Sequence, residues 1–158
     1  MTTREHAEFR VIGVEPAPQG SKRYVGNGRF IEASKKLEPF RKAIGQAVQD
    51  LYESTGDTST FTVPVEVTAT FILPKPKTVK RLWPSVAPDT DKLQRALGDS
   101  ISLEKYCDPP LVEDDALIVQ WHAEKIYGTR EEMGVILGIE LAKYPRHMEP
   151  IDGFDTIK

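Results

Sequence analysis

Hydrophobic residues alternate with polar or small ones in four stretches of the chain, and this period of two indicates β-strands. Between the strands, hydrophobic residues recur every three or four positions, which is typical of amphipathic helices. The expected strands cover residues 9–14, 63–73, 116–125 and 133–141, and the expected helices run from Leu37 to Leu51 and from Leu93 to Ile101. The sequence therefore predicts an α+β fold in the order β-α-β-α-β-β, with a small mixed β-sheet and two main helices.

Turn-forming residues separate these elements. Pro16, Pro18 and Gly20 exclude regular structure after the first strand, and the GNGR segment at 26–29 predicts either a hairpin turn or a loose loop. Residues 127–130 resemble a turn, so the last two strands are expected to form a hairpin. Each helix also has a side chain that suits its N-cap: Ser34 for the first and Asp91 for the second.

A chain of 158 residues has the usual size of one domain. We expect that domain over residues 1–143, followed by a polar, flexible tail over 144–158. No hydrophobic run is long enough to cross a membrane, and the first residues lack the hydrophobic part of a signal peptide, so a cytoplasmic location is expected. Cys107 is the only cysteine, which excludes an internal disulfide and a cysteine-based zinc site.

Charge is distributed unevenly along the chain. The net charge is −3, but residues 1–95 hold 15 Lys and Arg against 11 Asp and Glu, whereas residues 96–158 hold 6 against 13. Binding to a polyanion depends on local basic patches and not on the total charge. The basic half could therefore face phosphates, and part of the acidic half could hold a metal ion.

The acidic residues Asp89 and Asp91 stand two positions apart, where an extended chain enters the second helix. Residues i and i+2 of an extended chain point the same way, so the two carboxylates can converge. A divalent cation would offset their repulsion, and oxygen ligands favour Mg²⁺ or Mn²⁺. Arg95 and Asp99 continue the same helix face, which leaves open that the helix carries only a surface ladder of charges.

A second acidic cluster, Glu113-Asp114-Asp115, directly precedes the third expected strand. It is either a solvated turn or part of a metal site. The alternation of the strand places Asp115 on the face of Leu117 and Trp121.

Two segments now point to a family. PDTDKLQRALGDSI at 88–101 and VEDDALIVQWHAEK at 112–125 resemble the signature of the RusA family of Holliday junction resolvases, and PQGSKR at 18–23 resembles its phage-type members. The similarity covers about residues 65–127. It implies a RusA-like fold and a Mg²⁺-dependent endodeoxyribonuclease, with Mn²⁺ as a possible substitute, that acts as a homodimer on branched DNA, specifically the four-way junction, in recombination and repair.

The resemblance also implies roles for individual residues. Asp89, Asp91 and Asp115 match the essential acids of the family and would hold the metal, while Arg95 stands where the family has a catalytic Lys. Arg keeps the positive charge but cannot transfer a proton near neutral pH, so electrostatic stabilisation is the role it can fill. Lys92 replaces the usual Asn. The accessory positions are Asp99, Asp114 and Lys92.

Basic residues surround the acidic motif. A loop before Asp89 carries four of them, and this charge run is either a solvated loop or a phosphate-binding surface, with Trp83 placed either to stack on junction bases or to pack. Lys125 is too far along a straight strand from Asp115 to share its metal site, so a phosphate contact is expected. The predicted DNA-binding residues are Lys22, Arg23, Lys75, Lys77, Lys80, Arg81 and Lys125.

Two rival functions remain compatible with the sequence. One is a related nuclease that prefers flaps, forks or other branched DNA. The other is a non-catalytic, junction-binding relative, a reading that the intact set of three aspartates disfavours and that Arg95 leaves open.

Overall fold

The computed structural model describes residues 3–20, 22–32, 35–143 and 145. Its elements follow the expected order, with one additional hairpin. They are β1 His6–Ile12, β2 Lys22–Gly26, β3 Arg29–Glu32, α1 Leu37–Thr55, β4 Val65–Pro74, α2 Thr90–Ser102, the 3-10 turn η1 Asp115–Leu117, β5 Ile118–Gly128 and β6 Gly134–Leu141. The predicted α+β fold with a mixed sheet and two helices is confirmed.

One four-stranded sheet forms the centre of the molecule, in the order β1-β6-β4-β5. β4 pairs in parallel with β5 and antiparallel with β6, and β6 pairs antiparallel with β1. The prediction that the last two strands form a hairpin is therefore wrong, because β4 lies between them. Local alternation identifies a strand but does not identify its neighbour, and β4 carries enough buried residues to occupy the centre of the sheet.

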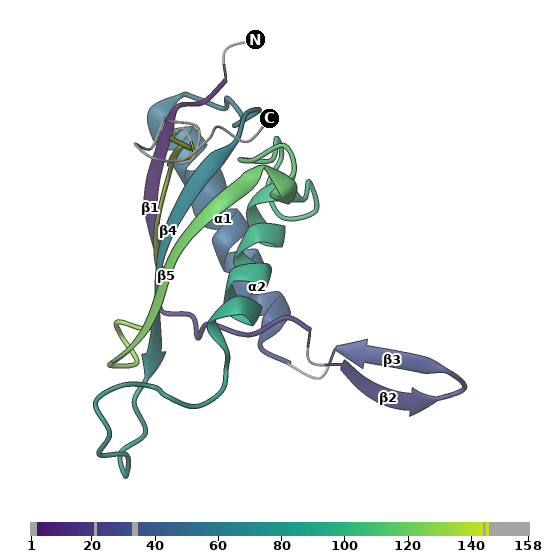
Figure 1. Cartoon of the computed structure of the whole chain (residues 1–158), viewed down its shortest axis with the longest axis vertical. Helices are drawn as coiled ribbons and strands as arrows, with labels where there is room; N and C mark the ends of the chain where they lie inside the picture. Colours follow the sequence, from purple (N-terminus) through teal and green to yellow (C-terminus); the bar gives the residue numbers. More distant parts are fainter. Residues whose placement is uncertain (1–2, 21, 33–34, 144, 146–158) are drawn as a thin grey trace, which may run out of the picture.

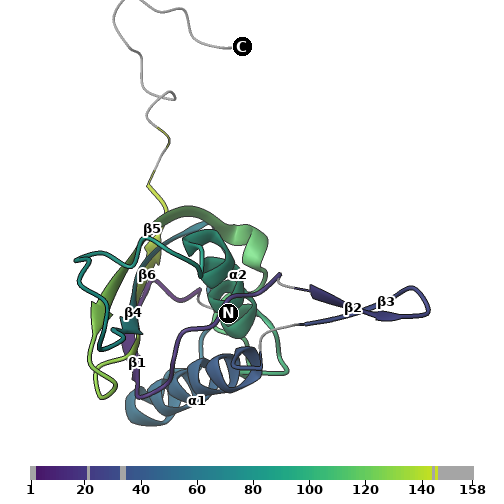
Figure 2. The same cartoon turned by 90° about the horizontal axis from the view of Figure 1, so that it is seen from below.

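Both helices cover the same face of this sheet (Figures 1 and 2). α1 packs on the β1 side and α2 on the β5 side, and the two helices contact each other. The core lies between the layers and includes fully buried Phe40 and Ile44 of α1, Phe71 of β4 and Leu97 of α2. These residues belong to the hydrophobic faces that the sequence periodicity identified.

The β2–β3 hairpin extends away from the main body (Figures 1 and 2). Its turn uses Asn27 and Gly28 with positive φ angles of 52° and 69°, which these two residue types adopt readily. Of the two possibilities left open for residues 26–29, the hairpin turn is thus the correct one. Ser34, the expected cap of the first helix, lies outside the described residues, as do residues 144 and 146–158 of the expected tail. The N-cap of α1 is Lys36, whose side chain makes no capping hydrogen bond.

The start of β5 departs from simple alternation. Val65 of β4 pairs with Ile118 and Glu66 pairs with Gln120, so Val119 is the extra residue of a β-bulge and its side chain is 56% exposed. Asp115 lies before the strand, in η1. The expectation that Asp115 shares a strand face with Leu117 and Trp121 is therefore wrong, because a 3-10 turn and a bulge both interrupt the period of two.

Candidate active site

α2 and the beginning of β5 enclose a hollow of about 190 Å³. Its lining consists of Asp91, Gln94, Arg95, Gly98, Asp115, Ile118 and Trp121. Two of the three acidic residues predicted for the metal site thus meet here, together with the predicted catalytic cation. Ile118 and Trp121 supply an apolar wall, which lowers the local dielectric and strengthens the interactions between these charges.

The close approach of α2 to β5 brings the two halves of the site together. Asp91 and Arg95 lie one turn apart on α2, so their side chains share a face. One turn further on, a Cβ atom at Gly98 would lie 3.8 Å from Cζ2 of Trp121 and 3.9 Å from Cβ of Asp115. Such an atom would make only ordinary van der Waals contacts, so the distances simply show that α2 lies close to Trp121 and to the turn that carries Asp115 at this point.

Asp115 lies close to other negatively charged side chains. The carboxylate of Asp114 accepts a hydrogen bond of 2.9 Å from the backbone N–H of Ala116 and so caps η1. Burial raises the pKa of the Asp115 carboxyl, and the hydrogen bond with Asp114 and the negative charges of Asp99 and Asp114 raise it further. A cation bound in the hollow would relieve this concentration of negative charge.

Asp89 is the N-cap of α2, with an extended backbone at φ −73° and ψ 146°. The prediction that Asp91 caps the helix is therefore wrong by two residues, since Asp91 already lies in the first helical turn. The extended-chain argument for converging carboxylates fails for the same reason. The Asp89 carboxylate makes no capping hydrogen bond, is exposed, and lies outside the lining of the hollow.

The oxygen-only donors of the site suit a hard divalent cation. Within the described part of the chain, no three His, Cys, Asp or Glu side chains are close enough together to hold a metal ion. Mg²⁺ does not require such a cage, because proteins usually bind it through one or two carboxylates together with water and substrate phosphates. Asp91 and Asp115 meet that requirement, and Asp89 is near in sequence.

A protein-family model described as endodeoxyribonuclease RusA matches residues 13–140. The matched region contains α1, α2, β4, β5 and every residue that lines the hollow. The chain belongs to the RusA family. It is therefore an endodeoxyribonuclease, a hydrolase that acts on DNA phosphodiester bonds, and the family is that of the Holliday junction resolvases. No curated protein is significantly similar to the chain.

In this RusA-family chain, Asp99 is held by two residues that the sequence analysis did not identify. Gln19 Nε2 donates a hydrogen bond of 2.6 Å to Asp99 Oδ2, and Arg41 Nη2 lies 3.1 Å from the same oxygen. Arg41 Nη2 also donates to Oε1 of Gln19. Asp99 thus joins α2 to α1 and to the segment after β1. The spacing of residues within one helix could not predict these contacts. Asp99 is therefore more than the last member of a row of charges on the surface of α2.

The segment after β1 also runs past Arg95. The backbone N–H of Gln19 donates to the carbonyl oxygen of Lys92 at 3.1 Å. At Gly20, where φ is +99°, a Cβ atom would lie only 3.1 Å from Nη1 of Arg95. Glycine therefore suits this position for two reasons: it adopts the positive φ angle readily, and it leaves space for the guanidinium group of Arg95. Gln19 and Gly20 of the PQGSKR motif thus border the candidate site.

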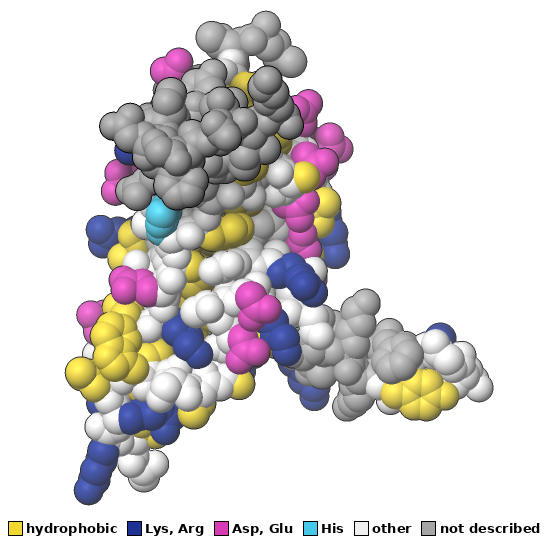
Figure 3. All heavy atoms as spheres, in the orientation of Figure 1, with side chains coloured by type: hydrophobic (Ala, Val, Ile, Leu, Met, Phe, Trp, Pro, Cys, Tyr) yellow, Lys and Arg dark blue, Asp and Glu magenta, His cyan; other side chains and the backbone are white. Residues whose placement is uncertain are grey.

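The predicted basic loop lies between β4 and α2, at one end of the main body (Figure 3). Lys75, Lys77, Lys80 and Arg81 are all exposed there. Lys75 Nζ and Arg81 Cζ lie 5.7 Å and 5.8 Å from the centre of the Tyr127 ring. The loop thus presents positive charge on the side of the RusA-family domain from which α2 begins; the side chains of Lys22 and Arg23 lie outside the described part of the structure.

Lys125, for which a phosphate contact is expected, makes two hydrogen bonds within the protein that the sequence did not reveal. Its ammonium group donates hydrogen bonds of 2.7 Å to the carbonyl oxygen of Val86 and 2.9 Å to that of Pro88. The side chain therefore binds the segment directly before Asp89. Lys92, which like Arg95 departs from the RusA pattern, lies outside the lining of the hollow.

Among the described residues, no helix is both long and apolar enough to cross a membrane.

Proposed function

We propose that the protein is a Mg²⁺-dependent, structure-selective endonuclease that resolves Holliday junctions by paired incision in DNA recombination and repair. The observation that carries this proposal is the meeting of Asp91, Asp115 and Arg95 in one hollow. Two acids and a cation beside an apolar wall suit hydrolysis of a phosphodiester, since negative charge builds up on the phosphate as the bond breaks. Mn²⁺ is the expected substitute for Mg²⁺.

The metal ligands in this proposal are Asp91 and Asp115, joined by Asp89. When bound, the ion supplies Lewis-acid activation of water and of the phosphoryl group. Arg95 offsets the charge that develops on the phosphate oxygens and cannot itself move a proton. Ile118 and Trp121 exclude water from one side of the hollow, which strengthens each of these electrostatic interactions.

Paired incision implies two active sites. A four-way junction has two opposed strands of the same polarity, and a homodimer with a two-fold axis places one site on each strand. The basic loop of each subunit would then contact the phosphates that flank the incised bond. We accordingly propose a homodimer as the active form.

The test is a cleavage assay with labelled four-way junction, flap and linear duplex DNA, each with Mg²⁺, with Mn²⁺ and with EDTA. We expect symmetric nicks in the junction, no cleavage with EDTA and little cleavage of linear duplex. Faster cleavage of flaps than of junctions would favour a nuclease for other branched DNA.

Matched variants complete the test. Asp89→Asn, Asp91→Asn and Asp115→Asn should each abolish cleavage and leave junction binding largely intact, because removing a negative charge does not weaken attraction to DNA. Wild-type turnover by any of the three would remove that residue from the active site. A wild-type protein that binds junctions but never cleaves them, with either metal, would make it a non-catalytic relative.

A further inference from the structure

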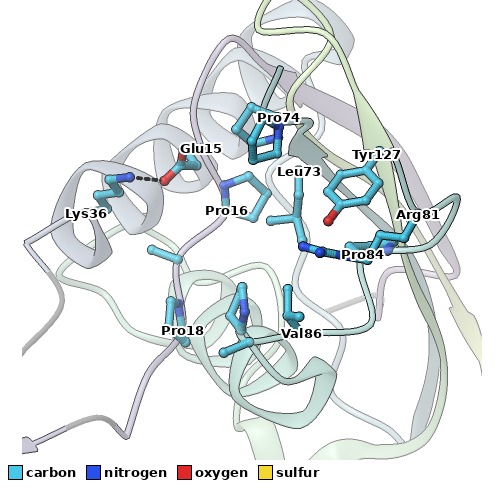
Figure 4. Close-up of a pocket in the computed structure, with 14 residues that line it drawn as sticks. Glu15, Pro16, Pro18, Lys36, Leu73, Pro74, Arg81, Pro84, Val86 and Tyr127 are labelled. Carbon is cyan, nitrogen blue, oxygen red and sulfur yellow. Dashed lines mark hydrogen bonds and ion pairs between the residues drawn. The ribbon is translucent and has the colours of Figure 1, made fainter. Parts of the chain in front are cut away.

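A cavity of about 370 Å³ lies between the segment after β1, the end of β4 and the loop before α2 (Figure 4). Six of its lining residues are prolines: Pro16, Pro18, Pro74, Pro76, Pro84 and Pro88. A proline ring fixes its own backbone angle and has no side-chain rotamers to lose on binding. The walls are therefore rigid and apolar, and the cavity exists before any ligand arrives.

Positive charge lines the rim. On one side Lys36 forms an ion pair with Glu15, which neutralises the only carboxylate among the lining residues, and on the other side lie Arg81 and Tyr127 (Figure 4). Arg81 and Lys75 both approach the Tyr127 ring, at 5.8 Å and 5.7 Å from its centre. An apolar interior thus opens beside an aromatic ring and two cations that form no ion pair with any described residue.

The cavity is close to the active site along the chain. Pro88 lines the cavity and Asp91 lines the active-site hollow. Only two residues separate them, so their Cα atoms are at most about 11 Å apart. Since Lys125 binds the carbonyl oxygen of Pro88, the segment that joins the two sites is also held in place. A ligand that fills both sites must be long, and its two ends must be a phosphate and an apolar group.

We propose that this cavity receives one unstacked nucleobase of the DNA strand whose phosphate lies in the active site. This inference rests on the proposed function. The rigid apolar walls suit the flat faces of a base, Tyr127 offers a ring for stacking, and Arg81 and Lys75 meet the phosphates on either side. An apolar peptide side chain would fill the walls equally well, but it would bring no negative charge to the two cations beside the Tyr127 ring.

The experiment uses the full-length protein and four-way junctions in which one nucleotide at a time, on both sides of the incised phosphate, is replaced by an abasic site. Binding is measured with EDTA so that no cleavage occurs. We expect that removal of one particular base weakens binding about 5- to 100-fold, the range for loss of one stacked base, while neighbouring removals change little.

Two variants tie that position to the cavity. Tyr127→Ala removes the stacking ring, and Val86→Trp fills the cavity from a side chain that is 48% exposed and therefore needs no change in the core. In both variants, binding should no longer depend on that base. Leu82→Ala is the matched control, because this exposed apolar residue belongs to the same loop but lies outside the cavity lining, so the dependence on the base should persist. Thermal melts establish that each variant is folded.

Three outcomes overturn the inference. Uniform tolerance of abasic sites by a wild-type protein that binds and cleaves junctions would reject the base pocket and leave the proposed function standing. Persistence of the base dependence in a folded Val86→Trp variant would place the base elsewhere on the protein. Failure of the wild type to bind junctions at all would reject the pocket and the proposed function together.

Discussion

The ammonium nitrogen of Lys125 lies 2.9 Å from the carbonyl oxygen of Pro88, the residue directly before Asp89. This hydrogen bond joins the middle of β5 to the segment that enters α2. Together with the bond to Val86, it sets where the cap of α2 stands relative to the sheet. The position of Asp89 therefore depends on a side chain from another element.

Lys125→Met should test this positioning role, because it keeps the length of the side chain and removes the ammonium group. We expect the free energy of unfolding to fall by about 1–3 kcal/mol, as for loss of a charged hydrogen-bond donor. The single-turnover cleavage rate should also be lower. The salt dependence of DNA binding should not change. Thermal melts, single-turnover kinetics and binding titrations over a range of salt concentrations measure the three quantities.

The sequence predicted instead that Lys125 contacts a DNA phosphate. In that case the slope of log affinity against log salt would fall by about 0.9 in the Lys125→Met variant, with an unchanged melting temperature. Lys77→Met is the matched comparison, since Lys77 is exposed and belongs to the basic loop.

Asp115→Asn should raise thermal stability at neutral pH. Burial and the neighbouring acids raise the pKa of Asp115, so the folded state resists its ionisation. An acid with a raised pKa destabilises the fold above that pKa and has no such effect below its unfolded pKa. The difference in melting temperature between variant and wild type should therefore shrink as the pH falls, and melts over a pH series without divalent metal measure it.

Asp57→Asn is a control of opposite sign. Hydrogen bonds from Ser59 hold the pKa of Asp57 below its usual range, so this carboxylate stabilises the fold above its unfolded pKa and the benefit is lost in acid. The variant should melt at a lower temperature than wild type at neutral pH. If Asp115→Asn also lowered the melting temperature there, the account of Asp115 as a carboxyl with a raised pKa would be wrong.

The basic loop should contribute to DNA affinity through charge alone. The double variant Lys77→Ala and Lys80→Ala is expected to bind junctions more weakly and to lower the log–log salt slope by about 0.9 for each lost phosphate contact. As a control of equal charge change, Lys42→Ala with Lys105→Ala removes lysines of α1 and of the loop after α2. An unchanged slope in the loop variant would show that the loop is a solvated surface segment that does not contact DNA phosphates.

Much of the fold could be predicted because it is encoded locally. The spacing of Phe40, Ile44 and Val48 predicted α1, and the alternation from Val65 to Phe71 predicted β4. Each pattern follows from burial of one face, which requires no knowledge of the rest of the chain. The family resemblance could be identified from the sequence for a similar reason, since the acidic motifs lie in two continuous segments.

The features that sequence reasoning missed are contacts between distant segments. Neither the pairing of β4 with β5 and β6 nor the contact of Gln19 and Arg41 with Asp99 leaves a periodic signal. The bulge at Val119 breaks a period that the sequence itself continues. Within the proposed site, the family resemblance grouped Asp91 with Asp115, and both line one hollow because α2 approaches the start of β5. The extended-chain argument for Asp89 and Asp91 was wrong, because Asp91 already lies in the first turn of α2.

Arg95 is the position where this chain departs most clearly from the RusA pattern, and two variants define its task. Arg95 lines the active-site hollow with Asp91 and Asp115, and it can supply charge but not a proton. If it stabilises the transition state, Arg95→Lys should retain substantial activity, whereas Arg95→Ala should lose about 10²-fold or more in single-turnover rate.

The alternative is that Arg95 only contributes charge to the surface of α2. Arg95→Ala should then cost less than about 1 kcal/mol of stability and leave cleavage almost unchanged. Single-turnover rates at saturating protein, with thermal melts alongside, separate the two cases, because a transition-state role lowers the rate without a matching loss of stability. A fully active Arg95→Ala protein would place the catalytic cation elsewhere, and Lys92, which replaces the usual Asn of the motif, is then the first residue to substitute.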